Sequence, residues 1–137
     1  MAGLLERFLA AESERAFCWG TRDCLLFLAD WVCAQTGIDP AAGYRGRYAN
    51  RADAYRIVRQ AGGMAPLVER LLTDRGVPFT PTDVQSPRSF GVVRLPEPTG
   101  AIWTGRFWAC PAETGVALRL GEPIKTWEIK CHKRLQY

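Results

Sequence analysis

The chain has 137 residues, enough for one domain with its own hydrophobic core. Hydrophobic residues make up 47% of it and the net charge is +4, which is the composition of a folded protein rather than a disordered one. No apolar run approaches the roughly 18 residues that span a bilayer. The N-terminus carries glutamates where a secretory signal has basic and then apolar residues. We therefore expect synthesis in a reducing cytoplasm and no membrane span.

The cysteines follow no pattern typical of a disulfide framework or a zinc site. They are irregularly spaced, at Cys18, Cys24, Cys33, Cys110 and Cys131. Neither a metal nor another cofactor is therefore expected. Basic residues are not interleaved with aromatic residues as they are in proteins that bind single-stranded nucleic acid, so nucleic acid is not an expected partner.

Hydrophobic spacing and capping residues predict four helices in the first part of the chain. They cover about residues 4–9, 23–35, 50–62 and 64–76. The second is predicted to be amphipathic. In the third, Ala54, Tyr55 and Val58 are expected to point inward.

After Gly76 any further helix is interrupted by prolines at positions 78, 81, 87, 96 and 98, and short runs of β-forming residues follow. These runs cover about residues 90–95, 101–104, 107–110, 116–120 and 125–131. Glycine turns at residues 104–106 and 113–115 predict hairpins. The sequence therefore predicts a single α+β domain over residues 1–137. Its N-terminal helices, about 1–76, pack on a small C-terminal antiparallel sheet, about 88–131.

A cysteine stands at the predicted start of the second helix. Trp19 and Gly20 form a tight turn, Asp23 caps the helix, and Cys24 takes the first helical position. The positive end of a helix favours a thiolate, but by only about 0.3–1 kcal/mol, less than one pKa unit. Cys24 is therefore expected to be mostly a thiol at neutral pH unless a base assists it.

Trp19-Gly20 and Asp23-Cys24, ahead of a small sheet, resemble the motif of the NlpC/P60 cysteine peptidases, which are papain-like enzymes that cut peptidoglycan stem peptides. Residues 100–109 are similar to a hairpin of the same family. The resemblance covers about residues 17–127. It implies an NlpC/P60 (papain-like) fold with Cys24 as the candidate nucleophile, supported by Trp19, Gly20 and Asp23.

The histidine of that family belongs just before the strand at Ala101, where this chain has Thr99 and Gly100. The only histidine in the sequence is His132, in a basic C-terminal segment. It would serve as the base only if the last strand folded back over Cys24. Loss of general acid–base catalysis slows such reactions by about 10²–10⁴-fold. The pattern therefore favours a retained fold with lost or weak chemistry.

The pattern Asp23-Cys24-x-x-Phe27-x-Ala29-Asp30-Trp31 also resembles an uncharacterised phage and prophage family encoded among tail-tip genes. This resemblance implies a structural component of a bacteriophage tail tip, in the baseplate or hub region. Such a protein is made in the cytoplasm of the bacterial host, is located in the virion and binds other tail proteins, namely hub, distal tail and central fibre proteins.

Two alternatives stay open. One is an active peptidoglycan endopeptidase, acting in tail assembly or genome delivery, with Cys24 as nucleophile and His132 as base. Peptidoglycan would then be a partner. The other is an unrelated α+β binding module in which Asp23 and Cys24 are only a helix cap and a core thiol.

Four residues are candidates for a protein interface. Trp103 and Trp108 flank a tight turn, and tryptophan is enriched at interfaces. If both faces of the alternating strand pattern are occupied, one of them is expected to be exposed. Arg45 and Arg47 form an Arg-Gly-Arg loop that could anchor an acidic neighbour. Core packing and a solvated loop are the respective alternatives. Asp30, beside apolar residues, is expected to pair with an arginine.

Overall fold

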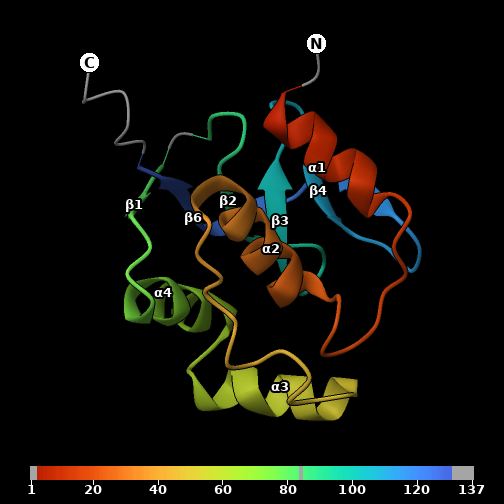
Figure 1. The fold of residues 1–137 in the computed structure, drawn as a ribbon, viewed down its shortest axis with the longest axis vertical. Coiled ribbons are helices and arrows are strands. Elements are labelled where there is room, and N and C mark those ends of the chain that lie inside the picture. Colours follow the sequence, from red (N-terminus) through yellow and green to blue (C-terminus); the bar gives the residue numbers. More distant parts are fainter. Residues whose placement is uncertain (1–2, 84, 131–137) are drawn as a thin grey trace.

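Helices and strands segregate along the chain, as predicted, into a helical first half followed by an antiparallel sheet in one α+β domain (Figure 1). The computed structural model describes residues 3–83 and 85–130. The helices are α1 (Leu4–Glu12), α2 (Cys24–Thr36), α3 (Arg51–Gln60) and α4 (Met64–Asp74). Over this part of the chain, none of them combines the length and the apolar character needed to cross a membrane.

The strands form one six-stranded sheet in the order β1-β6-β2-β3-β4-β5, and all neighbouring pairs are antiparallel. They are β1 (Phe79–Pro81), β2 (Phe90–Arg94), β3 (Pro98–Trp103), β4 (Trp108–Pro111), β5 (Val116–Arg119) and β6 (Glu122–Ile129). The sequence did not predict β1, a three-residue edge strand that ends in a proline and pairs with β6. Proline is tolerated at such an edge because one side of the strand needs no ladder hydrogen bonds.

The sheet must curl strongly, because β5 and β6 are joined by only Leu120 and Gly121. In the strand order β6 lies four places from β5, which is about 19 Å in a flat sheet. A two-residue connection spans at most about 11 Å. Inside the curl, Val93, Ala101, Trp108 and Cys110 form a second small core on one face of the sheet.

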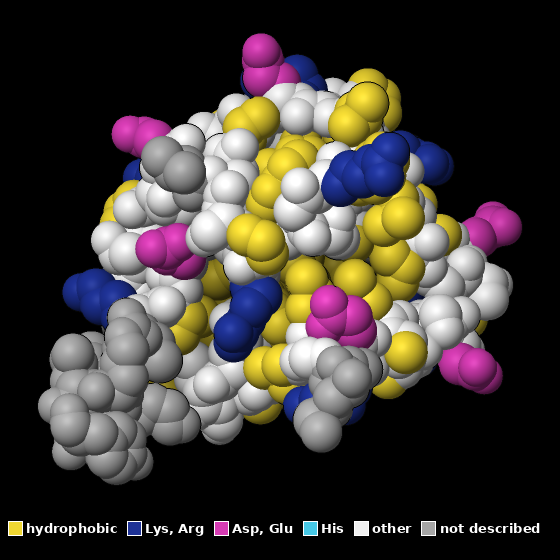
Figure 2. Space-filling view, turned by 90° about the horizontal axis from the view of Figure 1, so that it is seen from above, with side chains coloured by type: hydrophobic (Ala, Val, Ile, Leu, Met, Phe, Trp, Pro, Cys, Tyr) yellow, Lys and Arg dark blue, Asp and Glu magenta, His cyan; other side chains and the backbone are white. Residues whose placement is uncertain are grey.

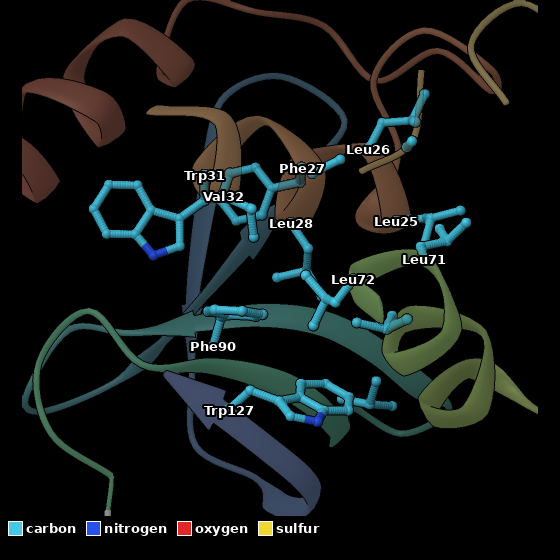
Figure 3. Close-up of a cluster of buried hydrophobic side chains, with 14 of the residues drawn as sticks. Leu25, Leu26, Phe27, Leu28, Trp31, Val32, Leu71, Leu72, Phe90 and Trp127 are labelled. Carbon is cyan, nitrogen blue, oxygen red and sulfur yellow. The ribbon is translucent and has the colours of Figure 1, made fainter. Parts of the chain in front are cut away.

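The main core is built around α2, which is buried on almost every side rather than amphipathic as predicted. The helix contains few polar residues among its leucines, Phe27, Trp31 and Val32. A helix with apolar side chains on every face is stable in water only when every face is buried. Figure 3 shows the side chains of α2 above Phe90 of the sheet, with Leu71 and Leu72 of α4 beside them. The ring centroids of Phe90 and Trp127 are 6.0 Å apart. α2 also packs along β3, which brings its first turn to the sheet.

A buried ion pair joins three segments that the core alone would leave loosely connected. Arg22, 1% exposed, donates from Nε to Oε1 of Glu12 at 2.8 Å. Its Nη2 donates to the carbonyls of Glu12 at 3.1 Å and Gly115 at 2.7 Å. The end of α1, the turn before α2 and the β4–β5 turn therefore meet at one guanidinium group.

Replacing Glu12 with Gln should lower the free energy of unfolding by about 3–5 kcal/mol, because it leaves the buried Arg22 charge without its carboxylate. The matched control is Arg56→Gln, which removes an exposed pair with Asp53 and should change stability by less than about 1 kcal/mol. Urea denaturation measures both values. Equal effects of the two substitutions would contradict a stabilising role for the buried pair.

Candidate functional site

The turn that leads to Cys24 can be made only with a glycine at position 20. Gly20 has a φ of +82°, and a Cβ on it would lie 1.9 Å from the backbone carbonyl oxygen of Tyr48. Its own carbonyl accepts from the amide of Gly46 at 2.9 Å. The turn at Gly20 and the loop at residues 46–48 are therefore in direct backbone contact. The predicted tight turn is compatible with this contact, but the sequence of the turn alone does not predict it.

Asp23 caps α2 as predicted and also holds the neighbouring loop. Its Oδ1 accepts from the amide of Leu26 at 3.0 Å, and its Oδ2 accepts from the amide of Gly20 at 3.0 Å and the hydroxyl of Tyr48 at 2.7 Å. Asp23 is only 2% exposed, and these three donors take the place of the water that its carboxylate loses on burial. Burial and the Asp23 charge together raise the pKa of Tyr48. This arrangement makes Asp23 a structural anchor.

Cys24 follows the cap, half-buried at the first position of α2. Burial raises the pKa of its thiol to about 11, against the lowering effect of a hydrogen bond from the Gly100 backbone. The Asp23 charge raises the pKa further. Desolvation of the sulfur outweighs the small helix-end effect, so Cys24 is a thiol at neutral pH, in agreement with the expectation from the sequence.

The strand expected to carry a histidine lies directly against Cys24. A Cβ on Gly100 of β3 would lie 2.5 Å from the Cys24 carbonyl oxygen and 2.9 Å from two side-chain carbons of Leu28. No larger residue fits at position 100 without displacing α2. Thr99 lies beside Cys24 in the same cavity but is not a base. His132, the candidate base of the sequence analysis, lies outside the described residues.

A cavity of about 310 Å³ opens beside Cys24. Its walls come from the segment before α2 and from α2, α3, α4 and the β2–β3 turn, and they include Phe17, Trp19, Leu25, Tyr55, Ile57, Val58, Met64, Leu67, Pro98 and Thr99. Sequence reasoning missed this cavity. Tyr55, expected to point inward, is exposed at the rim because its hydroxyl donates to Glu97 at 2.6 Å and Arg51 pairs with Glu97 at 3.0 Å.

The tryptophans predicted for an interface face each other across a hairpin. Trp103 and Trp108 are register partners in β3 and β4, with ring centroids 5.1 Å apart. Trp108 is 2% exposed and Trp103 is half-buried, so this pair mainly fills the second core. In this conformation only Trp103 presents surface to a partner.

Arg45 and Arg47, separated by one glycine, differ in their contacts. Arg45 pairs with Asp30 at 2.7 Å and with Asp39 at 2.7 Å, which confirms the expected pairing of Asp30 with an arginine. The charge of Arg45 is therefore already neutralised by carboxylates of the same chain. Arg47 is exposed.

Figure 2 shows another face, the end where α1 lies, where hydrophobic side chains gather between separated basic and acidic groups. Among the described residues, no cluster of histidine, cysteine or acidic side chains could hold a metal ion.

The fold and site together define a small α+β domain with a capped, protonated cysteine beside an apolar cavity. Residues 2–129 match the family model described as a domain of unknown function, DUF6950, and the chain belongs to this family. No curated protein sequence and no solved structure matches it.

Replacing Gly20 with Ala should destabilise the protein by at least about 3 kcal/mol, because the new methyl group meets a backbone oxygen in a strained conformation. The control is Gly37→Ala at the end of α2, where φ is +79° and nothing lies within 4 Å of a new Cβ. That substitution should destabilise by only about 1–2 kcal/mol. Thermal and urea denaturation compare the two. A G20A loss no larger than the G37A loss would show that the close contact is unimportant.

Alkylation of Cys24 by iodoacetamide should be very slow at pH 7 and should rise about tenfold per pH unit until pH approaches 11, because only the thiolate reacts. The sign follows from the raised pKa, which holds the proton on sulfur to higher pH. Exposed Cys18 serves as the internal reference, and peptide mapping by mass spectrometry reports both rates. If Cys24 reacts as fast as Cys18 at pH 7, the thiol is not protonated as described.

Proposed function

We propose that this chain is a structural, non-hydrolytic component of a bacteriophage tail tip, with an NlpC/P60-like fold, and that it binds neighbouring tail proteins. The observation that carries the proposal is the surroundings of Cys24. A nucleophilic cysteine needs a base that lowers its pKa and an acid that protonates the leaving group. The described neighbours of Cys24 supply neither.

The placement of Cys24 supports the likeness to NlpC/P60 domains. The resemblance requires a cysteine at the start of a core helix, facing the strand on which that family carries its histidine. Here Cys24 opens α2, and β3 reaches it at Gly100. The elements of such a site are adjacent, while the position of the base is held by Thr99 or Gly100. Thr99 cannot act as a base, and Gly100 is packed too closely to be replaced by histidine.

The residues that carry the likeness to the phage tail-tip family act in holding the fold together. Trp31 donates from Nε1 to the carbonyl of Arg88 at 2.9 Å, and Asp30 binds Arg45 and Arg15. Asp23 holds the loop at Tyr48. These contacts, together with the lack of a base beside Cys24 among the described residues, support a scaffold role rather than hydrolysis.

Purified wild-type protein should release no product from muropeptides above the level of Cys24→Ala, with circular dichroism confirming that both are folded. Coexpression with the hub and distal tail proteins of the same phage should yield a complex that survives gel filtration. Turnover by the wild type that Cys24→Ala abolishes would overturn the proposal in favour of the endopeptidase, and His132→Ala would then test the base. Absence of any such complex would also count against a tail-tip role.

A further inference from the structure

Among the described residues, no lysine, arginine or histidine lines the cavity beside Cys24. Its two carboxylates are both bound by groups of the same chain: Asp23 accepts from Tyr48 at 2.7 Å, and Glu97 pairs with Arg51 at 3.0 Å. The thiol of Cys24 is neutral at ordinary pH. An anion entering the cavity would lose hydration without gaining a counter-charge. A cation would meet only Asp23, which is 2% exposed and already accepts three hydrogen bonds, and Glu97, which is already paired. The cavity is therefore complementary to an uncharged group.

One wall of the cavity is a row of three aromatic rings. Phe17 and Trp19 meet edge to face at a centroid distance of 4.9 Å, and Trp19 meets Tyr55 in the same manner at 6.4 Å. Within residues 3–83 and 85–130, no acceptor is recorded for the indole N–H of Trp19. Rigid aromatic surface with a free donor suits a peptide, because the rings bind a side chain and the donor binds a backbone carbonyl.

The mouth of the cavity has the layout of a protein interface. Arg51, Tyr55 and Glu97 form an exposed polar cluster around the apolar interior, as a polar rim surrounds the buried centre of an interface. Of the residues of α3, only Ala54 is buried, so few buried contacts hold this wall in place. Exposed ion pairs such as Arg51–Glu97 hold such a wall only weakly.

We propose that this cavity is the docking site for a partner protein, which inserts one uncharged aromatic or aliphatic side chain from an extended segment against Phe17, Trp19 and Tyr55. The volume of about 310 Å³ is at the lower end of the range for ligand pockets, about 300–1,000 Å³, and suits a single side chain. That the partner is a tail protein rests on the proposed function. The chemistry of the inserted group does not.

Cys24 provides a reporter inside the cavity. Iodoacetamide alkylation is followed at pH 9 with N-acetyltryptophanamide or N-acetyllysine amide present at the same millimolar concentration. A bound probe slows alkylation by a factor of one plus its concentration over its Kd, so at twice the Kd the rate at Cys24 falls about threefold. We expect this for the tryptophan probe only. The rate at exposed Cys18 should not change with either probe.

Val58→Phe fills the cavity from α3 and should abolish the protection, whereas Arg59→Phe on the exposed side of the same helix should preserve it. Equal protection by the two probes, or none by either, overturns the proposal. If Val58→Phe does not fold, the comparison of the probes on the wild type still decides. Muropeptide turnover would refute the proposed function without altering these rates, so the two failures are distinguishable.

Discussion

The carboxylate of Asp23 is the interaction on which the rest of the site depends. It is nearly inaccessible to water, and a bare charge in that position would be strongly destabilising. Three donors from three places offset this: the amide of Gly20 before the helix, the amide of Leu26 within it, and the hydroxyl of Tyr48 from a loop more than twenty residues further along. Turn, helix and loop are thus oriented by one group.

The same constraint decides the chemistry of Cys24. The cap that begins α2 also places a negative charge next to the sulfur, and β3 closes over it at Gly100. Burial of the sulfur and the Asp23 charge raise the pKa of Cys24, and they outweigh the hydrogen bond from the Gly100 backbone and the free amide at the helix start, which lower it. A helix N-terminus therefore does not activate a cysteine by itself. A thiol becomes a reactive thiolate only when solvent or a cationic partner stabilises the negative charge. Among the described residues, Cys24 has little contact with solvent and no cationic partner.

Local sequence predicted those parts of the fold that depend on local interactions. Asp23 and Asn50 cap α2 and α3 at the expected positions, and the turns at Gly105 and Gly115 join hairpins. β1 escaped prediction because its pairing partner, β6, is about fifty residues away and its own composition disfavours a strand. The ion pair of Glu12 with Arg22 escaped for a similar reason, since nothing in the intervening turn indicates that these charges meet.

The candidate site divides in the same way. The position of Cys24 at the start of α2 could be predicted from the sequence because helix capping is a local interaction. Its pKa and the cavity beside it could not, because they depend on segments that are distant in the sequence. Tyr55 illustrates the difference: helical spacing assigns it to the inner face of α3, but a hydrogen bond to Glu97 across the cavity mouth holds it at the rim. What the cavity accepts is therefore determined by tertiary contacts. These place an aromatic wall beside a thiol whose pKa is raised, and neither property can be read from the residues around Cys24 alone.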